Sequence, residues 1–143
     1  TCTLVDHING LAVSRDGARL YVAGLEDILI LDLETGAARL LEHGRDLCCG
    51  LGDGMALRDG HLFLVQNNGL LGQRILHLLL RDDGMAVEKS EFLYPGLPEG
   101  LMAYTCALGD GVLHVNGTAP FADYDKPDTP PMPVIVEIPY AWD

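Results

Sequence analysis

The amino-acid sequence predicts an all-β chain of repeated four-stranded sheets, the blades of a β-propeller. Three stretches share one pattern: a polar residue before glycine, a short apolar strand, a tight Asp-Gly turn and a second, stronger apolar strand. The polar residues that begin the stretches are Asn9, Asp53 and Glu99, so the pattern recurs after 44 and 46 residues. A period of about 40 to 50 residues, built from strands and Gly-Asp turns, is typical of a propeller blade.

Composition supports this fold class and excludes some partners. The 143 residues include 17 glycines and only 6% aromatic residues, which suits many short strands joined by tight turns. The formal net charge is −12, so the chain lacks the basic surface that a nucleic-acid partner needs. No apolar stretch approaches the roughly twenty residues of a membrane span, and we expect no membrane partner. The sequence indicates no cellular compartment.

The first blade is expected over residues 7–44, after an outer strand in residues 1–6 that has no partner strand before it. Its four strands are predicted near residues 11–14, 20–23, 28–33 and 38–41, with a hairpin turn at 34–36. Residues 28–33 are almost continuously apolar. That pattern favours a strand covered on both faces by neighbouring blades.

Two further blades follow. Residues 45–97 predict strands near 54–57, 61–66, 74–80 and 87–93; residues 98–143 predict strands near 101–108, 112–116 and 134–138, without an outer strand. The total is twelve strands, or three blades' worth cut out of phase. Three blades cannot close a ring, because propellers have four to eight. We therefore expect half of a six-bladed propeller, closed by a second copy or by a missing N-terminal half.

The repeat also predicts which residues share a face. In an up-and-down blade, the start of the first strand lies on the same face as the loop that joins the second and third strands. Asn9, Asp53 and Glu99 should therefore lie at the inner ends of three blades and point towards the central channel. The Asp-Gly turns lie on the opposite face, where hairpin formation explains them without any further function.

These three side chains can form an oxygen-lined cation site. Asn9 offers an amide oxygen, and Asp53 and Glu99 offer carboxylates, which are the ligands that hard divalent cations favour. Ca²⁺ is the ion expected first, and Mg²⁺, Mn²⁺ or Zn²⁺ could also bind such a site. The alternative is that each blade needs a small polar residue before glycine for the turn into its first strand. The repeat phase alone leaves both interpretations open.

Other residues near this face are candidates for contact with a substrate. Asn67 and Arg74 bracket the loop between the second and third strands of the middle blade, and His7 precedes Asn9 by two residues. Arg74 would suit a carboxylate or hydroxyl group. The sequence contains no phosphate-binding loop, dinucleotide fingerprint or His-Glu-x-x-His motif.

The cysteines predict no metal centre. None of the four has C-x-x-C spacing, and the adjacent pair Cys48 and Cys49 is a poor zinc ligand set. We expect buried free thiols, because cysteine packs as a small apolar residue.

Two motifs resemble the gluconolactonase/regucalcin family of six-bladed propellers. They are Asn-Gly-Leu-Ala-Val-Ser-Arg-Asp-Gly-Ala-Arg-Leu-Tyr-Val, which begins at Asn9, and Asp-Gly-Met-Ala-Leu, which begins at Asp53. In that family, the asparagine and the aspartate at these positions bind the catalytic divalent metal, so the resemblance implies that role for Asn9 and Asp53. The family's ligand glutamate comes from its first blade, which has no counterpart here. The role of Glu99 therefore rests on the repeat phase alone.

The resemblance implies a metal-dependent lactonase or esterase-like hydrolase with a small-molecule substrate. The cation would polarise the ester carbonyl and stabilise the developing oxyanion, while Asp53 handles the proton of an attacking water. The alternative function is a non-catalytic propeller that uses the same face as a binding or scaffold module, because fold does not fix function.

Overall fold

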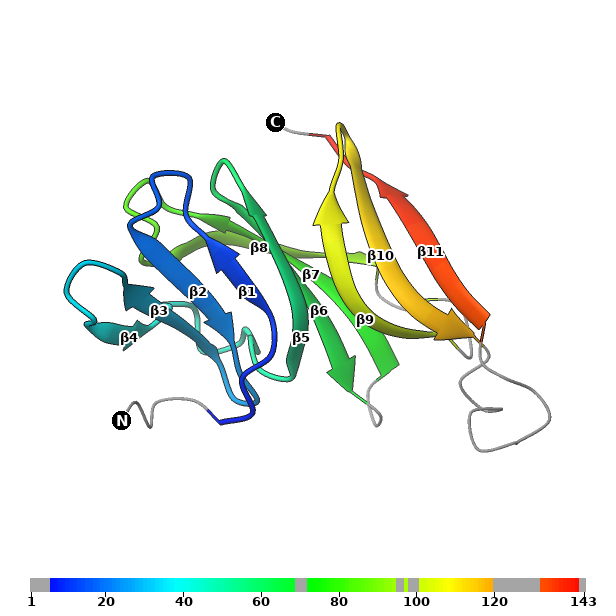
Figure 1. The fold of residues 1–143 in the computed structure, drawn as a ribbon, viewed down its shortest axis with the longest axis horizontal. Coiled ribbons are helices and arrows are strands. Elements are labelled where there is room, and N and C mark those ends of the chain that lie inside the picture. The colour runs from blue at the N-terminus through cyan, green and yellow to red at the C-terminus, as the bar shows by residue number, and fades with distance from the viewer. Residues whose placement is uncertain (1–5, 69–71, 95–96, 98–100, 120–131, 142–143) are drawn as a thin grey trace.

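The structure is a computed structural model that describes residues 6–68, 72–94, 97, 101–119 and 132–141. Its strands form three antiparallel sheets, in the orders β1-β2-β3-β4, β5-β6-β7-β8 and β11-β10-β9 (Figure 1). Each sheet pairs strands that are consecutive in the chain, and successive sheets pack face to face, as propeller blades do. We call the sheets blades one, two and three. Across the described residues, no helix has the length and apolar character needed to span a lipid bilayer.

The strand positions agree with the expected ones to within a few residues at each end. Blade one contains β1 (Leu11–Val13), β2 (Arg19–Ala23), β3 (Ile28–Asp32) and β4 (Ala38–Leu40). Blade two contains β5 (Gly52–Arg58), β6 (His61–Asn68), β7 (Gly72–Leu80) and β8 (Val87–Tyr94). Blade three contains β9 (Met102–Leu108), β10 (Val112–Ala119) and β11 (Met132–Pro139), and the described part of the chain shows no fourth strand in this sheet. The outer strand expected in residues 1–6 falls almost wholly outside the described residues.

Blade three departs from expectation in the length of its last two strands. The β10–β11 pairing continues through Gly117↔Val134 and Thr118↔Pro133, so both strands extend beyond the predicted ranges 112–116 and 134–138. In the described sheet, β11 is an edge strand. A proline is tolerated there because its missing N–H leaves no ladder hydrogen bond unmade when that side faces outward.

Blade two is the strand layer that is covered on both faces. Along β6, Leu62 and Leu64 pack into the apolar cluster shared with blade one, whereas Phe63 and Val65 pack into the cluster shared with blade three. All four side chains are fully buried. The prediction of two covered faces for residues 28–33 of blade one is therefore met on one face only, because the described structure places a neighbour on one side of that blade.

The innermost strands approach one another so closely that their glycines are required. A methyl group added at Gly10 would lie 2.4 Å from the carbonyl oxygen of Asp53, and one added at Gly54 would lie 2.2 Å from Cα of Thr105. Real side-chain carbons do not tolerate such contacts with backbone atoms. Blade packing therefore explains Gly10 and Gly54 of the repeated pattern, without explaining the polar residues that precede them.

We expect Gly54→Ala to lower the free energy of unfolding by about 1–3 kcal/mol or more, because overpacking against backbone cannot be relieved by a side-chain rotation. Gly44→Ala is the matched control: its added methyl group would meet no atom within 4 Å. Urea unfolding of both variants measures the difference. Equal stabilities would contradict the close packing of β5 against β9.

A stack of rings lies where blade two meets the end of blade three. The imidazoles of His61 and His77 are stacked with centroids 5.1 Å apart, and His61 Nδ1 lies 2.9 Å from His77 Nε2. The phenyl ring of Phe63 stacks on the other side of His77 at 4.6 Å. Burial lowers the pKa of His61 below its ordinary value of 6.5, the neighbouring His77 lowers it further, and Asp59 opposes the shift.

This shift predicts a dependence of stability on pH. Because the unfolded chain binds a proton at His61 more readily than the folded chain does, the free energy of unfolding should fall as the pH drops through 6.5. His61→Gln should reduce that fall between about pH 7.5 and about pH 5.5, a range in which histidines titrate and ordinary carboxylates do not. Thermal melts of the two proteins across this range provide the comparison. Parallel curves would show that His61 does not contribute.

Candidate polar site at the inner strand ends

A chain of polar side chains connects all three blades at the starts of the inner strands. Asn9 donates a hydrogen bond from Nδ2 to Asp53 Oδ1 at 2.6 Å, and Asn67 donates from Nδ2 to Asp53 Oδ2 at 3.2 Å. Gln73 donates from Nε2 to Asn67 Oδ1 at 3.2 Å, and its own Oε1 accepts from the backbone N–H of Ala103. Asp53 and Asn67 are half-buried, and Asn9 is exposed, so the cluster opens to solvent.

The backbone before Asp53 is irregular, and this irregularity aims its side chain. The pairing of β5 with β6 shifts between Gly52 and Met55, as at a β-bulge, and bulges redirect side chains. Leu51 has a φ of 58°, a left-handed conformation that costs a non-glycine residue roughly 1–2 kcal/mol. Two hydrogen bonds fix this residue: its N–H donates to the carbonyl of Leu25 at 2.7 Å, and its carbonyl accepts from Asn67 N–H at 3.1 Å.

Gln66 holds the segment before Asp53 in place through side-chain hydrogen bonds to its backbone. Its side chain is almost fully buried; Nε2 donates to the carbonyls of Cys48 at 2.9 Å and Gly50 at 2.6 Å. Its Oε1 accepts a hydrogen bond from Arg74 Nε at 2.8 Å. Sequence reasoning did not single out Gln66 or Gln73. The available signal was a polar side chain at the end of the otherwise apolar run of β6, where a buried amide needs partners for all its polar atoms.

The structure therefore brings three of the predicted site residues together: Asn9, Asp53 and Asn67. It does not bring Arg74 to them. Arg74 pairs with Gln66 across β6 and β7 and lies over the ring of Phe92 at 4.6 Å, on the sheet face opposite Asn67.

The other two predicted residues are not part of this cluster as described. His7 is exposed with a φ of 49°, and among the described residues it makes no hydrogen bond to the cluster. Glu99 lies outside the described residues, so its predicted place as a third metal ligand stays a prediction.

The donor chemistry of the cluster fits a hard cation. Asp53 supplies a carboxylate, and each oxygen keeps a second lone pair beside the hydrogen bond that it already accepts. Within the described part of the chain, Asn9 Oδ1 accepts no hydrogen bond, and a half-turn of the amide would bring this oxygen to the place now held by the nitrogen. Oxygen ligands of this kind suit Ca²⁺ or Mg²⁺. The described set contains one charge, so a cation there would also need ligands from water or from another carboxylate.

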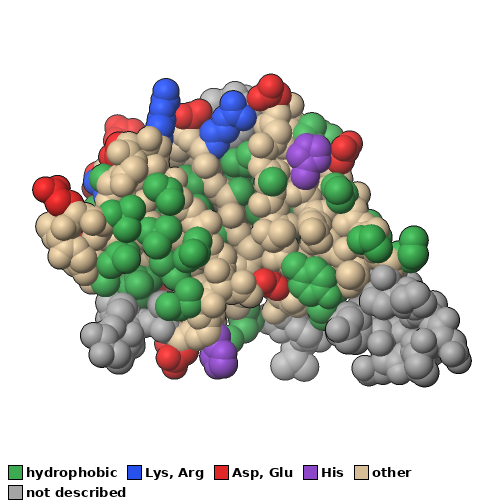
Figure 2. Space-filling model, in the orientation of Figure 1, with side chains coloured by type: hydrophobic (Ala, Val, Ile, Leu, Met, Phe, Trp, Pro, Cys, Tyr) green, Lys and Arg blue, Asp and Glu red, His purple; other side chains and the backbone are tan. Residues whose placement is uncertain are grey.

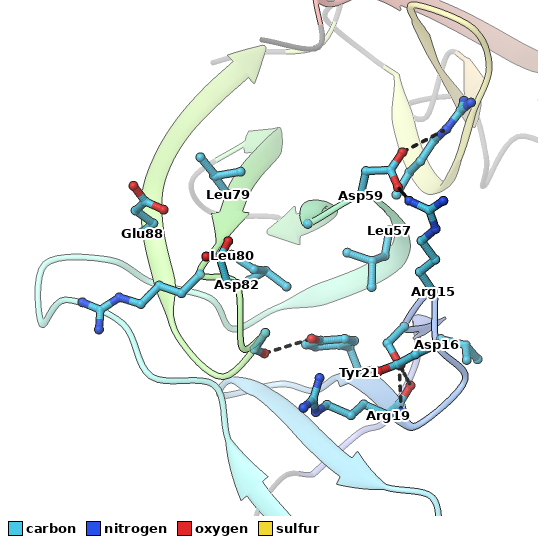
Figure 3. Close-up of a pocket in the computed structure, with 16 residues that line it drawn as sticks. Arg15, Asp16, Arg19, Tyr21, Leu57, Asp59, Leu79, Leu80, Asp82 and Glu88 are labelled. Atoms are coloured by element: carbon cyan, nitrogen blue, oxygen red, sulfur yellow. Dashed lines mark hydrogen bonds and ion pairs between the residues drawn. The ribbon is translucent and has the colours of Figure 1, made fainter.

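A large hollow in the described structure lies at the other ends of the strands. It has a volume of about 1190 Å³ and lies between the turns of blades one and two, lined by Tyr21, Leu57, Asp59 and Leu80 among others (Figure 3). Some of its charged groups are already engaged, as in the contact of Arg15 Nη1 with Asp59 Oδ1 at 2.9 Å. Size therefore does not identify the chemically suitable site. We assign the candidate site to the polar cluster.

Comparison with solved structures finds propellers. A gluconolactonase from Xanthomonas campestris matches with a TM-score of 0.52 and 24% identity, over 79% of this chain and 35% of that protein. A soluble aldose sugar dehydrogenase from Escherichia coli, in its apo form, matches with a TM-score of 0.64 and 16% identity, over 92% of this chain and 44% of that protein. A putative oxidoreductase (glucose dehydrogenase) from Thermus thermophilus matches with a TM-score of 0.55 and 19% identity, over 91% of this chain and 44% of that protein.

No protein-family model matches the sequence, and the comparison with curated proteins gave no match. The chain spans less than half of the length of each of these three structures. Identities below 25% establish the fold and not the activity. The chain therefore has the fold of a partial β-propeller, of the kind shared by this gluconolactonase and these sugar dehydrogenases.

Proposed function

We propose that this chain carries the metal-binding face of a divalent-cation-dependent hydrolase that acts on a lactone or related ester of a small, sugar-derived molecule. The observation that carries the proposal is the contact between Asn9 and Asp53, which come from two blades and meet at 2.6 Å on an open face. The resemblance of their two motifs to gluconolactonases supports the same conclusion. So does the fold shared with a gluconolactonase. Ca²⁺ is the cation proposed first, with Glu99 as a further ligand.

The residues of the cluster have separable roles in this proposal. A bound divalent cation supplies Lewis-acid polarisation of the ester carbonyl. Asn9 and Asp53 would hold this cation. Asp53 would accept a proton from the attacking water as the new C–O bond forms, and would return it to the alkoxide oxygen that leaves as the ester C–O bond breaks. Asn67 keeps the carboxylate oriented through its 3.2 Å hydrogen bond and is a proposed substrate contact. His7 remains a proposed substrate contact at the margin of the cluster. Arg74, which Gln66 and Phe92 hold on the opposite face of the sheet, is left out of the proposed contacts.

A non-catalytic binding module is the second candidate, and one observation favours it. Asp53 already accepts hydrogen bonds from two amides, one on each carboxylate oxygen, so the carboxylate is satisfied without a cation. In that case the glycines and their polar neighbours serve blade packing, and the open face binds a partner through hydrogen bonds alone.

Calorimetric titration of Ca²⁺ distinguishes the two candidates. Asp53→Asn removes the only charge of the described cluster while keeping its shape, so we expect affinity to fall by at least about 10-fold, since even outer-shell partners cost 10–100-fold. Metal-stimulated hydrolysis of a sugar lactone should fall by about 10²–10⁴-fold with the loss of the base. Asp82→Asn is the matched control, because Asp82 is an exposed acid in the turn after β7, at the opposite ends of the strands. Absence of metal binding by the folded wild-type chain would favour the binding module.

We further propose that another blade covers blade one, supplied by a second copy or by an N-terminal half of the same protein. The cross-strand row Leu11, Val22, Leu29 and Leu40 lies on one face of this blade, with Val22 and Leu29 buried and the two outer residues exposed. Figure 2 shows hydrophobic side chains gathered over this blade. Leu11 is 55% exposed and its neighbour along β1, Val13, is 53% exposed. Patches of this kind mark interaction sites or cause aggregation.

Light scattering tests this closure. The wild-type chain should associate as its concentration rises, and Leu11→Lys should shift the equilibrium towards monomer by placing a charge in the contact. Leu25→Lys is the control, because Leu25 is 43% exposed but belongs to the connection between β2 and β3. A wild-type chain that stays monomeric and soluble at high concentration, indistinguishable from the Leu11 variant, would contradict closure by any partner.

A further inference from the structure

A second group of metal-ligating side chains takes no part in the polar cluster. Asp27, His43 and Cys49 place a carboxylate oxygen, an imidazole nitrogen and a thiol sulfur within 4.8 Å of one another. Asp27 ends the connection between β2 and β3, and the other two residues belong to the connection between β4 and β5. Asp27 and His43 are half-buried, and Cys49 is 1% exposed.

The contacts of His43 define what its ring nitrogens can do. Nδ1 lies 2.9 Å from the backbone carbonyl oxygen of Gly44, and Nε2 lies 3.1 Å from Asp27 Oδ2 and 3.2 Å from Asp27 Oδ1. Both partners are acceptors. A neutral ring satisfies only one of them with its single N–H, so satisfying both contacts takes either a second proton on the ring or a cation at one nitrogen. A histidine that donates Nδ1–H to a backbone carbonyl and presents Nε2 has the orientation usual for a metal ligand.

We propose that Asp27, His43 and Cys49 form a Zn²⁺ site, with one oxygen, one nitrogen and one sulfur ligand and a fourth position for water. These are the three ligand atoms that zinc accepts in tetrahedral sites. Two ligands bound to one zinc at about 2.0–2.1 Å lie about 3.3 Å apart. The separation of 3.1–3.2 Å between His43 Nε2 and the Asp27 carboxylate is close to that value. The thiolate and the carboxylate together balance the charge of the ion, so the filled site is neutral, as burial requires.

Each ligand is held in place by another group. Asp27 Oδ1 accepts from the backbone N–H of Ile28 at 2.7 Å. Cys49 is flanked by the two carbonyls, of Cys48 and Gly50, that Gln66 binds. A methyl group added at Gly50 would lie 2.5 Å from the carbonyl oxygen of Leu25, so the segment after Cys49 fits tightly against the connection that carries Asp27. Outer-shell contacts of this kind orient metal ligands.

The same residue types could suggest a cysteine nucleophile activated by histidine, but the contacts do not build one. Both nitrogens of His43 face Gly44 and Asp27, so neither is directed to the sulfur as its hydrogen-bond partner. Burial raises the pKa of Cys49 to about 12, with nearby Asp27 adding to the shift, and a buried thiol of this kind is a poor nucleophile in the absence of a metal.

The proposed zinc site is joined to the polar cluster by a short stretch of chain and shares none of its residues. Cys49 precedes Asp53 by four residues, through the segment that contains the left-handed Leu51. Zinc would fix the connection between β4 and β5 to the β2–β3 connection of blade one. The ion would therefore stabilise the packing of these two connections, and its fourth position would hold water, as in zinc sites with three protein ligands. The site is independent of the function proposed for Asp53.

Titration with Co²⁺ and then Zn²⁺ tests the site. Cobalt bound to a thiolate gives a charge-transfer absorption that oxygen ligands alone do not give, and zinc should displace it. We expect this band in the wild-type chain and in Cys48→Ser, whose altered side chain is exposed and adjacent but outside the site. Cys49→Ser should lose the band, and Asp27→Asn and His43→Gln should bind zinc at least about 10-fold more weakly.

Asp53→Asn separates this site from the channel-facing one, because it should leave the cobalt band unchanged whatever it does to calcium. Absence of the band in the wild type would overturn the proposal, as would a band that Cys48→Ser abolishes and Cys49→Ser preserves. If Cys49→Ser does not fold, Asp27→Asn decides the question: zinc affinity equal to that of the wild type would contradict the ligand set.

Discussion

The close approach of the inner strands is the constraint on which the rest of this structure depends. At Gly10 and Gly54 the neighbouring backbone leaves no room for a side-chain carbon. The chain at the start of β1 can therefore approach β5, and β5 can approach β9, only with glycine at these two positions. This contact sets the spacing of the blades. The apolar side chains of β6, alternating towards blade one and blade three, then fill the two interfaces that the spacing defines.

The polar cluster follows from the same constraint. Because the glycines bring the strand starts together, the residues that precede them are brought together too. Asn9, at the start of blade one, therefore contacts Asp53 of blade two. The bulge at Gly52–Met55 and the strained Leu51 then aim Asp53 towards Asn67. Strain of this kind persists where surrounding contacts enforce it, and such positions often belong to functional sites. The same two dipeptides, Asn9-Gly10 and Asp53-Gly54, therefore contribute both to blade packing and to the polar cluster.

The fold could be predicted from the sequence because its signals are local and repeated. Asp-Gly turns such as Asp59-Gly60, with φ values of 49° and 84°, mark the hairpins directly. The shared phase of Asn9 and Asp53 predicted that they would approach each other. Arg74 was predicted to lie near Asn67 because both residues border the same loop. The period-two alternation of β6 and β7 instead directs Arg74 and Gln66 to the sheet face opposite Asn67.

The remaining contacts depend on how irregular connections pack. Asp27, His43 and Cys49 come together only because the connection between β4 and β5 folds against the one between β2 and β3, and no spacing rule describes that contact. The sequence suggested that the adjacent cysteines would be buried and without a metal. The structure buries Cys49 beside two other ligands and exposes Cys48.

A paramagnetic titration distinguishes a cation site at Asn9 and Asp53 from a packing contact alone. Mn²⁺, which favours oxygen ligands, is added while the amide NMR signals are followed. If the two residues bind the cation, the side-chain amide signals of Asn9 and Asn67 should broaden early and selectively, with the turns at Gly17 and Gly111 unaffected. Broadening that begins at the turns, or that spreads evenly over the acidic surface, would contradict the cation site.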